Sequence, residues 1–268
     1  MILVTGTTGK LGRDILTRLI ERDVDASGSS RSGAGSSRAL DFDEPGGISL
    51  RGVDTLVLVS AGEAEDDVVV ARHEAVIAAA ERDGVGHVVY TSLASQGEHL
   101  AFALAHRWTE RRLSRSSLSW TILRNGLYAD LFGSLLTWSG PRMTSAFGGG
   151  ALSAVTRGDL AEAAANVAEA PRPHAGAAYD LVGVPITARQ IAEQLGVPLA
   201  EITLEQRRRE LDSGGLKPFQ PAMLMSIYSS VRHGMLDGTS DDLERLLGRE
   251  PSDALSVAAA AALAASAL

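Results

Sequence analysis

The 268-residue sequence predicts an α/β protein with a doubly wound parallel sheet and a smaller, mostly helical C-terminal region. Short apolar runs alternate along the chain with amphipathic segments of helical length, which is the order of βαβ units. The clearest run, VDTLVLVSA at residues 53–61, has no polar alternation, as expected of a strand that is covered on both faces. Both observations favour a sheet with helices on its two sides.

The predicted elements follow one another regularly up to residue 183. The expected strands lie at 2–5, 24–30, 39–42, 53–61, 86–92, 117–126 and 177–183, and the expected helices at about 11–22, 65–83, 98–116 and 156–170. The first helix is assigned from Leu11, Ile15 and Leu19, which recur at helical spacing on one face. The stretch 141–154 is rich in glycine and is expected to be a loop.

The tail beyond residue 184 is expected to be mostly helical. Between Leu204 and Met235, a Gly-Gly break and two prolines separate amphipathic pieces. This pattern is compatible with a hinged lid, and equally with a helical hairpin that completes the core. We predict a sheet domain at 1–138, completed by 155–183, and a substrate-binding or lid region at 139–154 and 184–268.

Composition and charge exclude several classes of function. The formal net charge is −8 and no basic block is present, so the electrostatic footprint of a nucleic-acid-binding protein is missing. The chain has no cysteine, which excludes disulfides, thiolate catalysis and thiolate metal sites, and we expect no bound metal. The first strand begins at Ile2 and leaves no room for a signal peptide, which indicates a cytoplasmic protein.

The alanine-rich C-terminal stretch, residues 254–268, does not predict a membrane span. It is too short and too weakly apolar, because a bilayer span needs roughly 20 strongly apolar residues. We expect an amphipathic helix capped by Ser252 and no membrane partner.

The stretch TGTTGKLG, residues 5–12, joins the first strand to the first helix. Its glycines allow a tight turn and a close approach of the backbone to a pyrophosphate, and the helix behind it offers free N–H groups. The position at the start of a βαβ series favours a dinucleotide-binding Rossmann loop over a turn without a ligand. The predicted cofactor contacts are Gly6, Thr7, Thr8, Gly9, Lys10, Leu11 and Gly12.

The G-x-x-G-x-x-G spacing, with its preceding threonine, resembles the extended and atypical branches of the short-chain dehydrogenase/reductase superfamily. The second strand runs into SGSSRSG, which has no acidic residue to hold an adenosine ribose. Arg31 suits a 2′-phosphate instead, with Ser29, Ser30 and Arg38 as further donors. We therefore expect NADPH as the cofactor, with NADH possible. An arginine that is merely solvated remains the alternative.

The same resemblance implies further cofactor contacts. Asp41 and Phe42 resemble the third-strand motif that touches adenine. Ser60, Ala61 and Gly62, at the end of the fourth strand, fall where the family's chain passes the ribose and the nicotinamide.

The family's catalytic residues are only partly present. Ser92 in YTSLA resembles the serine that ends the fifth strand and polarises the substrate carbonyl. Phe102 and His106 stand where a Tyr-x-x-x-Lys pair is expected, so the usual proton donor is missing. His106 could bind a ribose hydroxyl and, near its unperturbed pKa of about 6.5, shuttle protons. Ordinary packing is the alternative for both residues.

Histidine on this helix resembles one subgroup, the NmrA-like atypical reductases, and within it the NADPH:quinone oxidoreductases. YTSLA, TILRNGLYADL and SAVTRGDLAEAAA also resemble that subgroup. The resemblance places Asn125, Gly126 and Leu127 at the nicotinamide carboxamide. It covers about residues 2–183 and is loose beyond 198.

The missing tyrosine limits the reaction that the resemblance implies. Hydride transfer to an isolated ketone needs a proton donor, whereas a quinone, or an aryl ketone with a neighbouring phenol, spreads or neutralises the charge itself. We expect a flat aromatic substrate, either a quinone or a polycyclic aryl ketone of an aromatic polyketide such as an angucyclinone, which would be a role in antibiotic biosynthesis. The candidate substrate contacts are Ser92, Tyr128, Trp138, Phe147, Phe219 and Met223.

Other functions remain open at this point. A catalytically silent NADP(H)-binding redox sensor of the NmrA type fits the missing tyrosine equally well. A sugar-nucleotide epimerase is disfavoured, because its chemistry needs that tyrosine. The chain is expected to act as a monomer or a homodimer.

Overall fold

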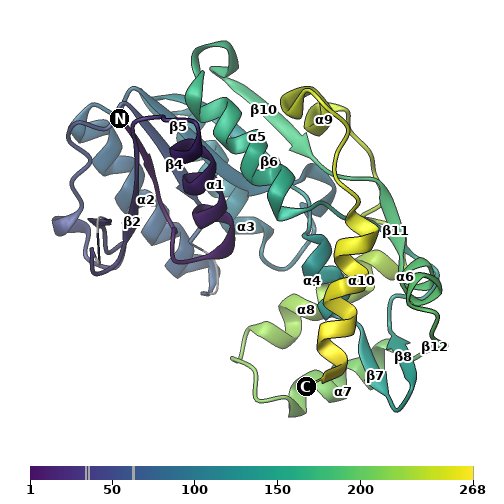
Figure 1. Ribbon diagram of the computed structural model, residues 1–268. Helices are drawn as coiled ribbons and strands as arrows, with labels where there is room; N and C mark the ends of the chain where they lie inside the picture. Colours follow the sequence, from purple (N-terminus) through teal and green to yellow (C-terminus); the bar gives the residue numbers. More distant parts are fainter. Residues whose placement is uncertain (34, 36, 62–63, 268) are drawn as a thin grey trace.

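The computed structural model describes residues 1–33, 35, 37–61 and 64–267, and its centre is a seven-stranded parallel sheet (Figure 1). The strand order is β10-β6-β5-β4-β1-β2-β3. The strands are β1 Ile2–Val4, β2 Ala26–Ser30, β3 Arg38–Ala39, β4 Thr55–Val59, β5 His87–Leu93, β6 Ser119–Asn125 and β10 Ala177–Leu181. The predicted fold class, a doubly wound parallel sheet, is confirmed.

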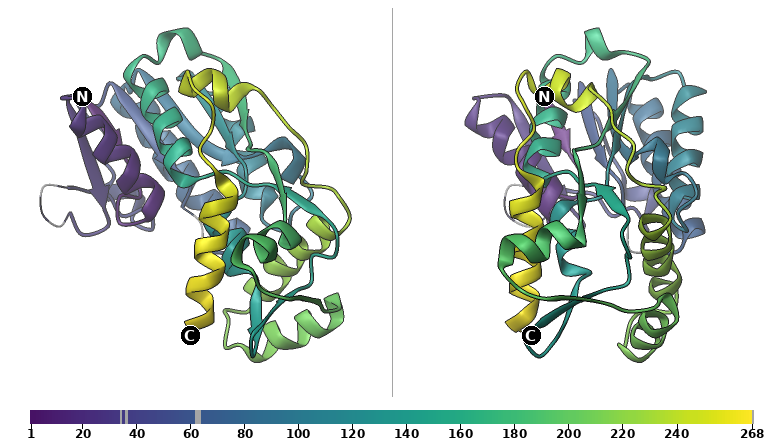
Figure 2. Two further views of the ribbon diagram at one scale, coloured as in Figure 1. Left: turned by 45° about the vertical axis from the view of Figure 1, so that its right-hand side comes forward. Right: turned by 90° about the vertical axis from the view of Figure 1, so that its right-hand side faces the viewer.

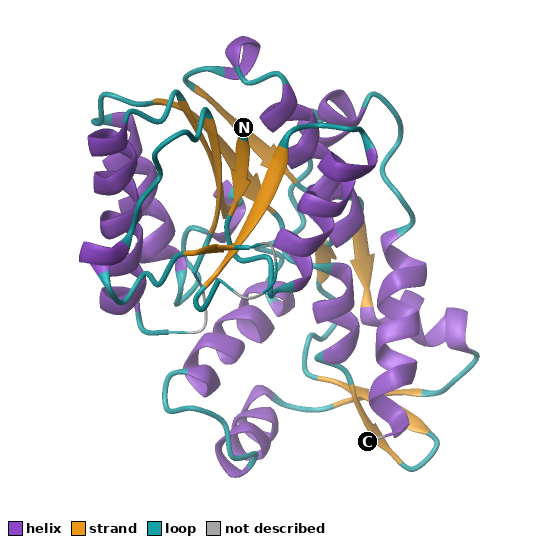
Figure 3. Ribbon diagram, turned by 60° about the vertical axis from the view of Figure 1, so that its left-hand side comes forward, coloured by secondary structure: helices purple, strands orange, loops and turns teal. Residues whose placement is uncertain are grey.

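Helices cover both faces of this sheet (Figure 3). They are α1 Lys10–Glu21 and α5 Arg157–Glu169 on one face, and α2 Asp66–Asp83 and α3 Ala103–Ser114 on the other. Successive strand residues point to opposite faces. Thus Val4 and Val57 pack beneath α1 and α5, whereas Leu3 and Leu56 pack beneath α2. Because both faces of the sheet are covered by helices, its strands are continuous apolar runs in the sequence.

A second region lies beyond the carboxyl ends of the strands, in the lower part of Figure 1. Its helices are α4 Ala129–Ser134, α6 Ala188–Leu195, α7 Leu204–Ser213, α8 Gln220–Arg232 and α10 Ala254–Ala264, and its strands are β7 Thr137–Ser139, β8 Arg142–Ser145, β9 Ala151–Ser153, β11 Pro185–Thr187 and β12 Leu199–Glu201. The views in Figure 2 show α10 running along this region, and it packs on α4. Helix α9, Asp242–Leu247, returns to α5.

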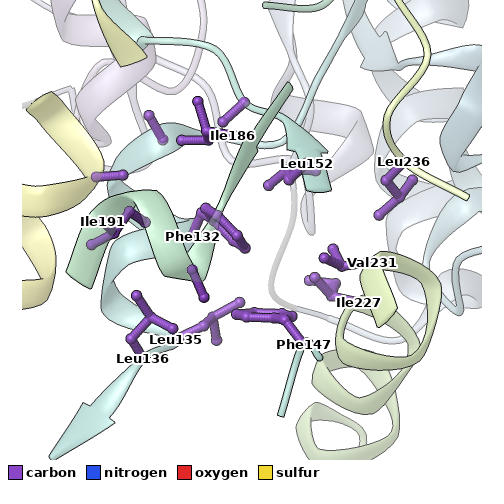
Figure 4. Close-up of a cluster of buried hydrophobic side chains, with 14 of the residues drawn as sticks. Phe132, Leu135, Leu136, Phe147, Leu152, Ile186, Ile191, Ile227, Val231 and Leu236 are labelled. Carbon is purple, nitrogen blue, oxygen red and sulfur yellow. The ribbon is translucent and has the colours of Figure 1, made fainter. Parts of the chain in front are cut away.

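The second region has its own hydrophobic core (Figure 4). Phe147 lies between Phe132 and Tyr228, with ring centroids 4.8 and 4.7 Å away. From α8, Ile227 and Val231 complete the cluster. The buried side of α8 is therefore part of this core.

Two local expectations were wrong. The glycine-rich stretch 141–154 is not only a loop, because β8 and β9 lie in it and pair with β7, β12 and β11. The cap of α10 is Asp253, whose carboxylate accepts from the N–H groups of Leu255 and Ser256. Ser252 instead bonds the buried carboxylate of Asp159 through its N–H and its hydroxyl, at 2.7 and 2.8 Å.

Over the described ranges, the structure contains no helix with the length and apolar character that a membrane crossing requires.

Candidate functional site

The loop after β1 brings α1 unusually close to the first strand. Gly6 has φ +64°, a conformation that favours glycine. A Cβ on Gly12 would lie 2.5 Å from the carbonyl oxygen of Gly6, so only glycine fits there. Helix α1 begins after Gly9 and has no side-chain cap. Its first N–H groups and its positive dipole end are thus available to an anion.

Hydrogen bonds hold this loop against its neighbours. The hydroxyl of Thr5 accepts from the N–H of Val59 at 2.9 Å, which ties β1 to β4. The hydroxyl of Thr7 donates to the carbonyl of Ser29 at 2.8 Å, which ties the loop to β2. The Thr7 side chain therefore stabilises the loop, and its hydroxyl proton is already donated to Ser29.

A cleft of about 630 Å³ opens beside the loop. It lies between the carboxyl ends of β1 and β4, where the strand order reverses and where open α/β sheets bind their ligands. Its lining includes these predicted cofactor residues: Gly6, Thr8, Gly9, Lys10, Leu11, Gly12, Arg31, Asp41, Phe42, Ser60 and Ala61. The predicted donors Ser29 and Ser30 also line it, whereas Arg38 does not.

Five lining residues were missed by sequence reasoning: Leu40, Asp43, Val59, Arg72 and Arg157. Arg72 of α2 forms a bidentate ion pair with Asp43, at 2.7 and 2.8 Å. This guanidinium lowers the pKa of Asp43, which stays ionised. Neither residue belongs to a motif, and only the fold brings them to the cleft.

Basic side chains lie at both ends of the cleft. At one end, Arg31 lies 3.8 Å from Asp41 and is largely exposed. At the other, the carboxylate of Asp130 holds Lys10 at 3.4 Å and Arg157 at 3.0 Å. Positive side chains with free donors at each end suit a ligand that carries phosphate at more than one position.

The side chain of Ser30 also indicates a ligand in the cleft. Its hydroxyl is buried, lines the cleft, and has no hydrogen-bond partner among the described residues. A buried polar group without a partner is costly, so a ligand hydroxyl or phosphate oxygen would stabilise it.

Several predicted cofactor residues lie outside the cleft lining. Asn125, Gly126 and Leu127 follow β6; the N–H of Gly126 bonds the carbonyl of Leu181, and the side-chain oxygen of Asn125 is buried without a partner. His106 of α3 bonds Tyr90 in the middle of β5 and does not line the cleft. The prediction for Gly62 falls outside the described residues.

Ser92 does not face a substrate in this structure. Its side chain is buried, and its hydroxyl donates to the carboxylate of Glu110 at 2.5 Å. The same carboxylate also binds Arg107 and Arg124, at 2.6 and 2.8 Å. The pleat of β5 points Ser92 under α3 into this polar network. Its expected role in polarising a carbonyl is therefore corrected: the hydroxyl proton is already in use.

His106 is partly buried in α3, and its side chain bonds to Tyr90. Burial, with a smaller effect of the Arg107 charge, lowers the pKa of His106 to about 4. Burial therefore argues against the expected proton shuttle near pH 6.5. The imidazole is neutral around pH 7 and can act there as a hydrogen-bond donor or acceptor.

Phe102 is the residue that precedes α3 and is partly buried against the core of the second region. Helix α8 docks beside it, because Ser226 accepts from the N–H of Ala101 at 3.2 Å and Ser230 bonds His99 at 2.8 Å. The C-terminal half of α8 therefore lies beside the residues that precede α3.

The predicted substrate contacts are dispersed. Phe219 and Met223 are partly buried at the start of α8. Tyr128 lies under the guanidinium of Arg157, 3.6 Å from the ring centre, and so adjoins the cleft. Phe147 is fully buried in the core and presents no surface to a ligand, because its two faces are already packed. Trp138 donates to the carbonyl of Ala262 at 2.9 Å.

In the part of the chain that the structure describes, no three histidine, aspartate or glutamate side chains gather in a way that could hold a metal ion.

No family model matches the chain, but individual proteins do. Quinone oxidoreductase 2 of Escherichia coli is 29% identical over 272 residues, covering 92% of this chain and 94% of that protein. A (4-alkanoyl-5-oxo-2,5-dihydrofuran-3-yl)methyl phosphate reductase of Streptomyces griseus is 30% identical over 280 residues, covering 93% of each. An NmrA-like family domain-containing oxidoreductase of Aspergillus flavus is 34% identical over 155 residues, about half of each chain.

Among solved structures, the triphenylmethane reductase of Citrobacter sp. in complex with NADP(H) superposes with a TM-score of 0.85. It is 26% identical, and the match covers 97% of this chain and 100% of that one. The similarity thus includes both the sheet and the second region.

Proposed function

The chain belongs to the NmrA-like atypical short-chain dehydrogenases/reductases, and we propose that it transfers a hydride from NADPH to a flat, conjugated carbonyl compound. It is an NAD(P)H-dependent oxidoreductase, as its relatives of matching length are. The proposed substrate is a quinone or a polycyclic aryl ketone of an aromatic polyketide.

The cleft at the end of β1 is the observation that carries the cofactor assignment. Gly6, Gly9 and Gly12 allow the close backbone approach that a pyrophosphate needs, and the uncapped start of α1 supplies the N–H groups. Arg31 and the unpartnered hydroxyl of Ser30 fit a 2′-phosphate or a ribose hydroxyl. When bound, the reduced nicotinamide supplies the hydride.

The proton-donor chemistry favours a conjugated acceptor. Phe102 has no exchangeable proton, and the hydroxyl of Ser92 is held by Glu110. The neutral imidazole of His106 can stabilise negative charge by donating a hydrogen bond but is a poor acid. A substrate that spreads the developing charge over a conjugated system needs less help from the protein than an isolated ketone.

Two of the relatives have names that specify a conjugated carbonyl compound: a quinone and a (4-alkanoyl-5-oxo-2,5-dihydrofuran-3-yl)methyl phosphate. The structural relative is named for triphenylmethane, an aromatic compound without a carbonyl group. This supports a conjugated acceptor for the present chain and leaves the choice between quinone and aryl ketone to experiment.

The test is NADPH oxidation measured with three classes of acceptor. We expect turnover with a soluble naphthoquinone and with a hydroxy-aryl ketone, and little with cyclohexanone. Tight NADPH binding without turnover on any acceptor would overturn the reductase proposal and favour the redox sensor. Turnover of cyclohexanone at the quinone rate would overturn the argument from conjugation.

A further inference from the structure

Helix α3, which carries His106, has no tyrosine, but a tyrosine side chain from β5 lies beside His106. Tyr90, in the middle of β5, is fully buried, and its hydroxyl lies 3.0 Å from Nδ1 of His106. The Tyr90 ring also packs edge-on against His73, with centroids 5.5 Å apart. Tyr90 thus brings a hydroxyl from the sheet to His106 on α3.

The hydrogen bonds of the neighbouring polar groups show where their protons lie. The N–H of Ala61 donates to Nε2 of His73 at 3.0 Å, so the ring proton of His73 is on Nδ1. That proton is donated to the hydroxyl of Thr109 at 2.8 Å, and Thr109 donates in turn to the carbonyl of Ala105 at 2.7 Å. His73 is neutral in this arrangement, because burial lowers its pKa to about 3.

The remaining proton to place belongs to Tyr90. Burial raises the pKa of this phenol, so it keeps its proton. The side chains of Ser60 and Thr109 hydrogen-bond the Tyr90 hydroxyl, and so does Nδ1 of His106, at 3.0 Å. If the phenol donates there, Nδ1 carries the lone pair, and the single proton of the neutral imidazole is on Nε2.

Nε2 of His106 has no hydrogen-bond partner among the residues that the structure describes. Nε2 is also partly accessible and not fully buried. The end of β4, which lines the cofactor cleft, is joined to the same cluster through Ala61 and His73. Nε2 is therefore the donor that this cluster leaves unused.

We propose that Tyr90 is a positioning residue that fixes the tautomer of His106 and keeps Nε2–H as a hydrogen-bond donor for the substrate oxygen. This inference rests on the proposed reductase function. In that reaction the hydride brings its electron pair to carbon and forms the new C–H bond, while the π pair of the carbonyl moves to oxygen. The donor stabilises this oxygen, and water supplies the proton that completes the hydroxyl group.

The first experiment needs no substitution of Tyr90. Long-range ¹H–¹⁵N spectra of the ring nitrogens, recorded on the full chain at pH 7, report the tautomer of each histidine. The His106 signals are identified by their loss in His106→Ala. We expect a neutral ring with the proton on Nε2. A proton on Nδ1, or a doubly protonated ring, would overturn the proposal.

The second experiment uses Tyr90→Phe, which keeps the ring and removes the hydroxyl. We expect the affinity for NADPH to stay within about twofold, kcat with a naphthoquinone to fall about tenfold, and the His106 signals to show mixed tautomers. In a His106→Ala background the same substitution should have no further effect on kcat. Equal losses in both backgrounds would contradict a role through His106.

The chain offers a matched control. Tyr179 of β10 bonds Nδ1 of His174 at 2.9 Å, with the rings edge-on and 5.6 Å apart, and neither residue lines the cleft. Tyr179→Phe removes a Tyr–His bond of the same kind and should leave kcat unchanged. If the starting protein turns over no acceptor, the reductase proposal fails, while the spectra still decide the tautomer of His106.

Discussion

Phe102 directly precedes α3, and its side chain has no proton to give. Phe102→Tyr adds one hydroxyl at a partly buried position beside α8. We expect kcat/KM for cyclohexanone to rise at least about tenfold, because a phenol can protonate the alkoxide. The rate with a naphthoquinone should change less than about twofold. An equal gain on both acceptors in steady-state assays would show that the quinone also lacked a donor.

Arg31 tests the cofactor preference. Its guanidinium is largely exposed at the rim of the cleft, so the loss from Arg31→Ala should be moderate: about tenfold weaker binding of NADPH, and less than twofold for NADH. Titration calorimetry measures both affinities. Arg51→Ala removes an exposed arginine outside the cleft and serves as the control. Equal losses for the two cofactors would refute a contact to the 2′-phosphate.

At the scale of single residues, the sequence predicted the cleft residues that belong to a motif. Most residues of the glycine loop lie together in the cleft, with Arg31 nearby. Arg72 was missed because it lies on α2 and shows no local pattern. Arg157 lies within SAVTRGDLAEAAA, but only the packing of α5 against the sheet brings it to the cleft. Ser92 was misjudged for another reason: its orientation depends on the pleat of β5 and on Glu110, and neither can be read from YTSLA.

At the scale of the elements, the proposed cofactor site depends on the close contact between the loop after β1 and helix α1. Gly12→Ala would place a methyl group 2.5 Å from a backbone oxygen, and backbone cannot rotate away as a side chain can. We expect a lower melting temperature and at least about tenfold weaker NADPH binding, measured by thermal denaturation and calorimetry. Gly47→Ala, at a position with open space around it, is the control. Unchanged binding in Gly12→Ala would argue against the loop as the cofactor site.

The elements that could be predicted are those with a long, self-contained signal. Strand β4 and helix α2 were predicted within a few residues, because an apolar run or a helical repeat marks each. Strands β9 and β12 were missed. Each has three residues and forms only through a partner distant in sequence, so local sequence carries no trace of the pairing.

For the whole molecule, three buried histidines predict loss of stability in acid. Burial lowers the pKa values of His73, His87 and His106 to about 3, 4 and 4, whereas in the unfolded chain all three titrate near 6.5. Between these values the unfolded state binds more protons than the folded state. The stabilisation is therefore fully present above about pH 6.5 and is lost as the pH falls toward 3.

The free energy of unfolding should fall by up to about 1.4 kcal/mol per histidine for each pH unit in that window. Urea unfolding at pH 7, 6 and 5 measures it. His87 bonds Ser119 and Thr121 away from the cleft, and Gln can keep polar contacts there without titrating. His87→Gln should reduce the pH dependence. A free energy that is the same at pH 7 and pH 5 would contradict neutral, buried histidines.

The central claim is that the loop after β1 and the cleft beside it bind a reduced dinucleotide. Isothermal titration calorimetry of the full chain with NADPH tests this most directly. The account predicts one molecule bound per chain, with tighter binding than for NADH. No detectable heat with either nucleotide, at protein concentrations where a micromolar affinity would be visible, would contradict it.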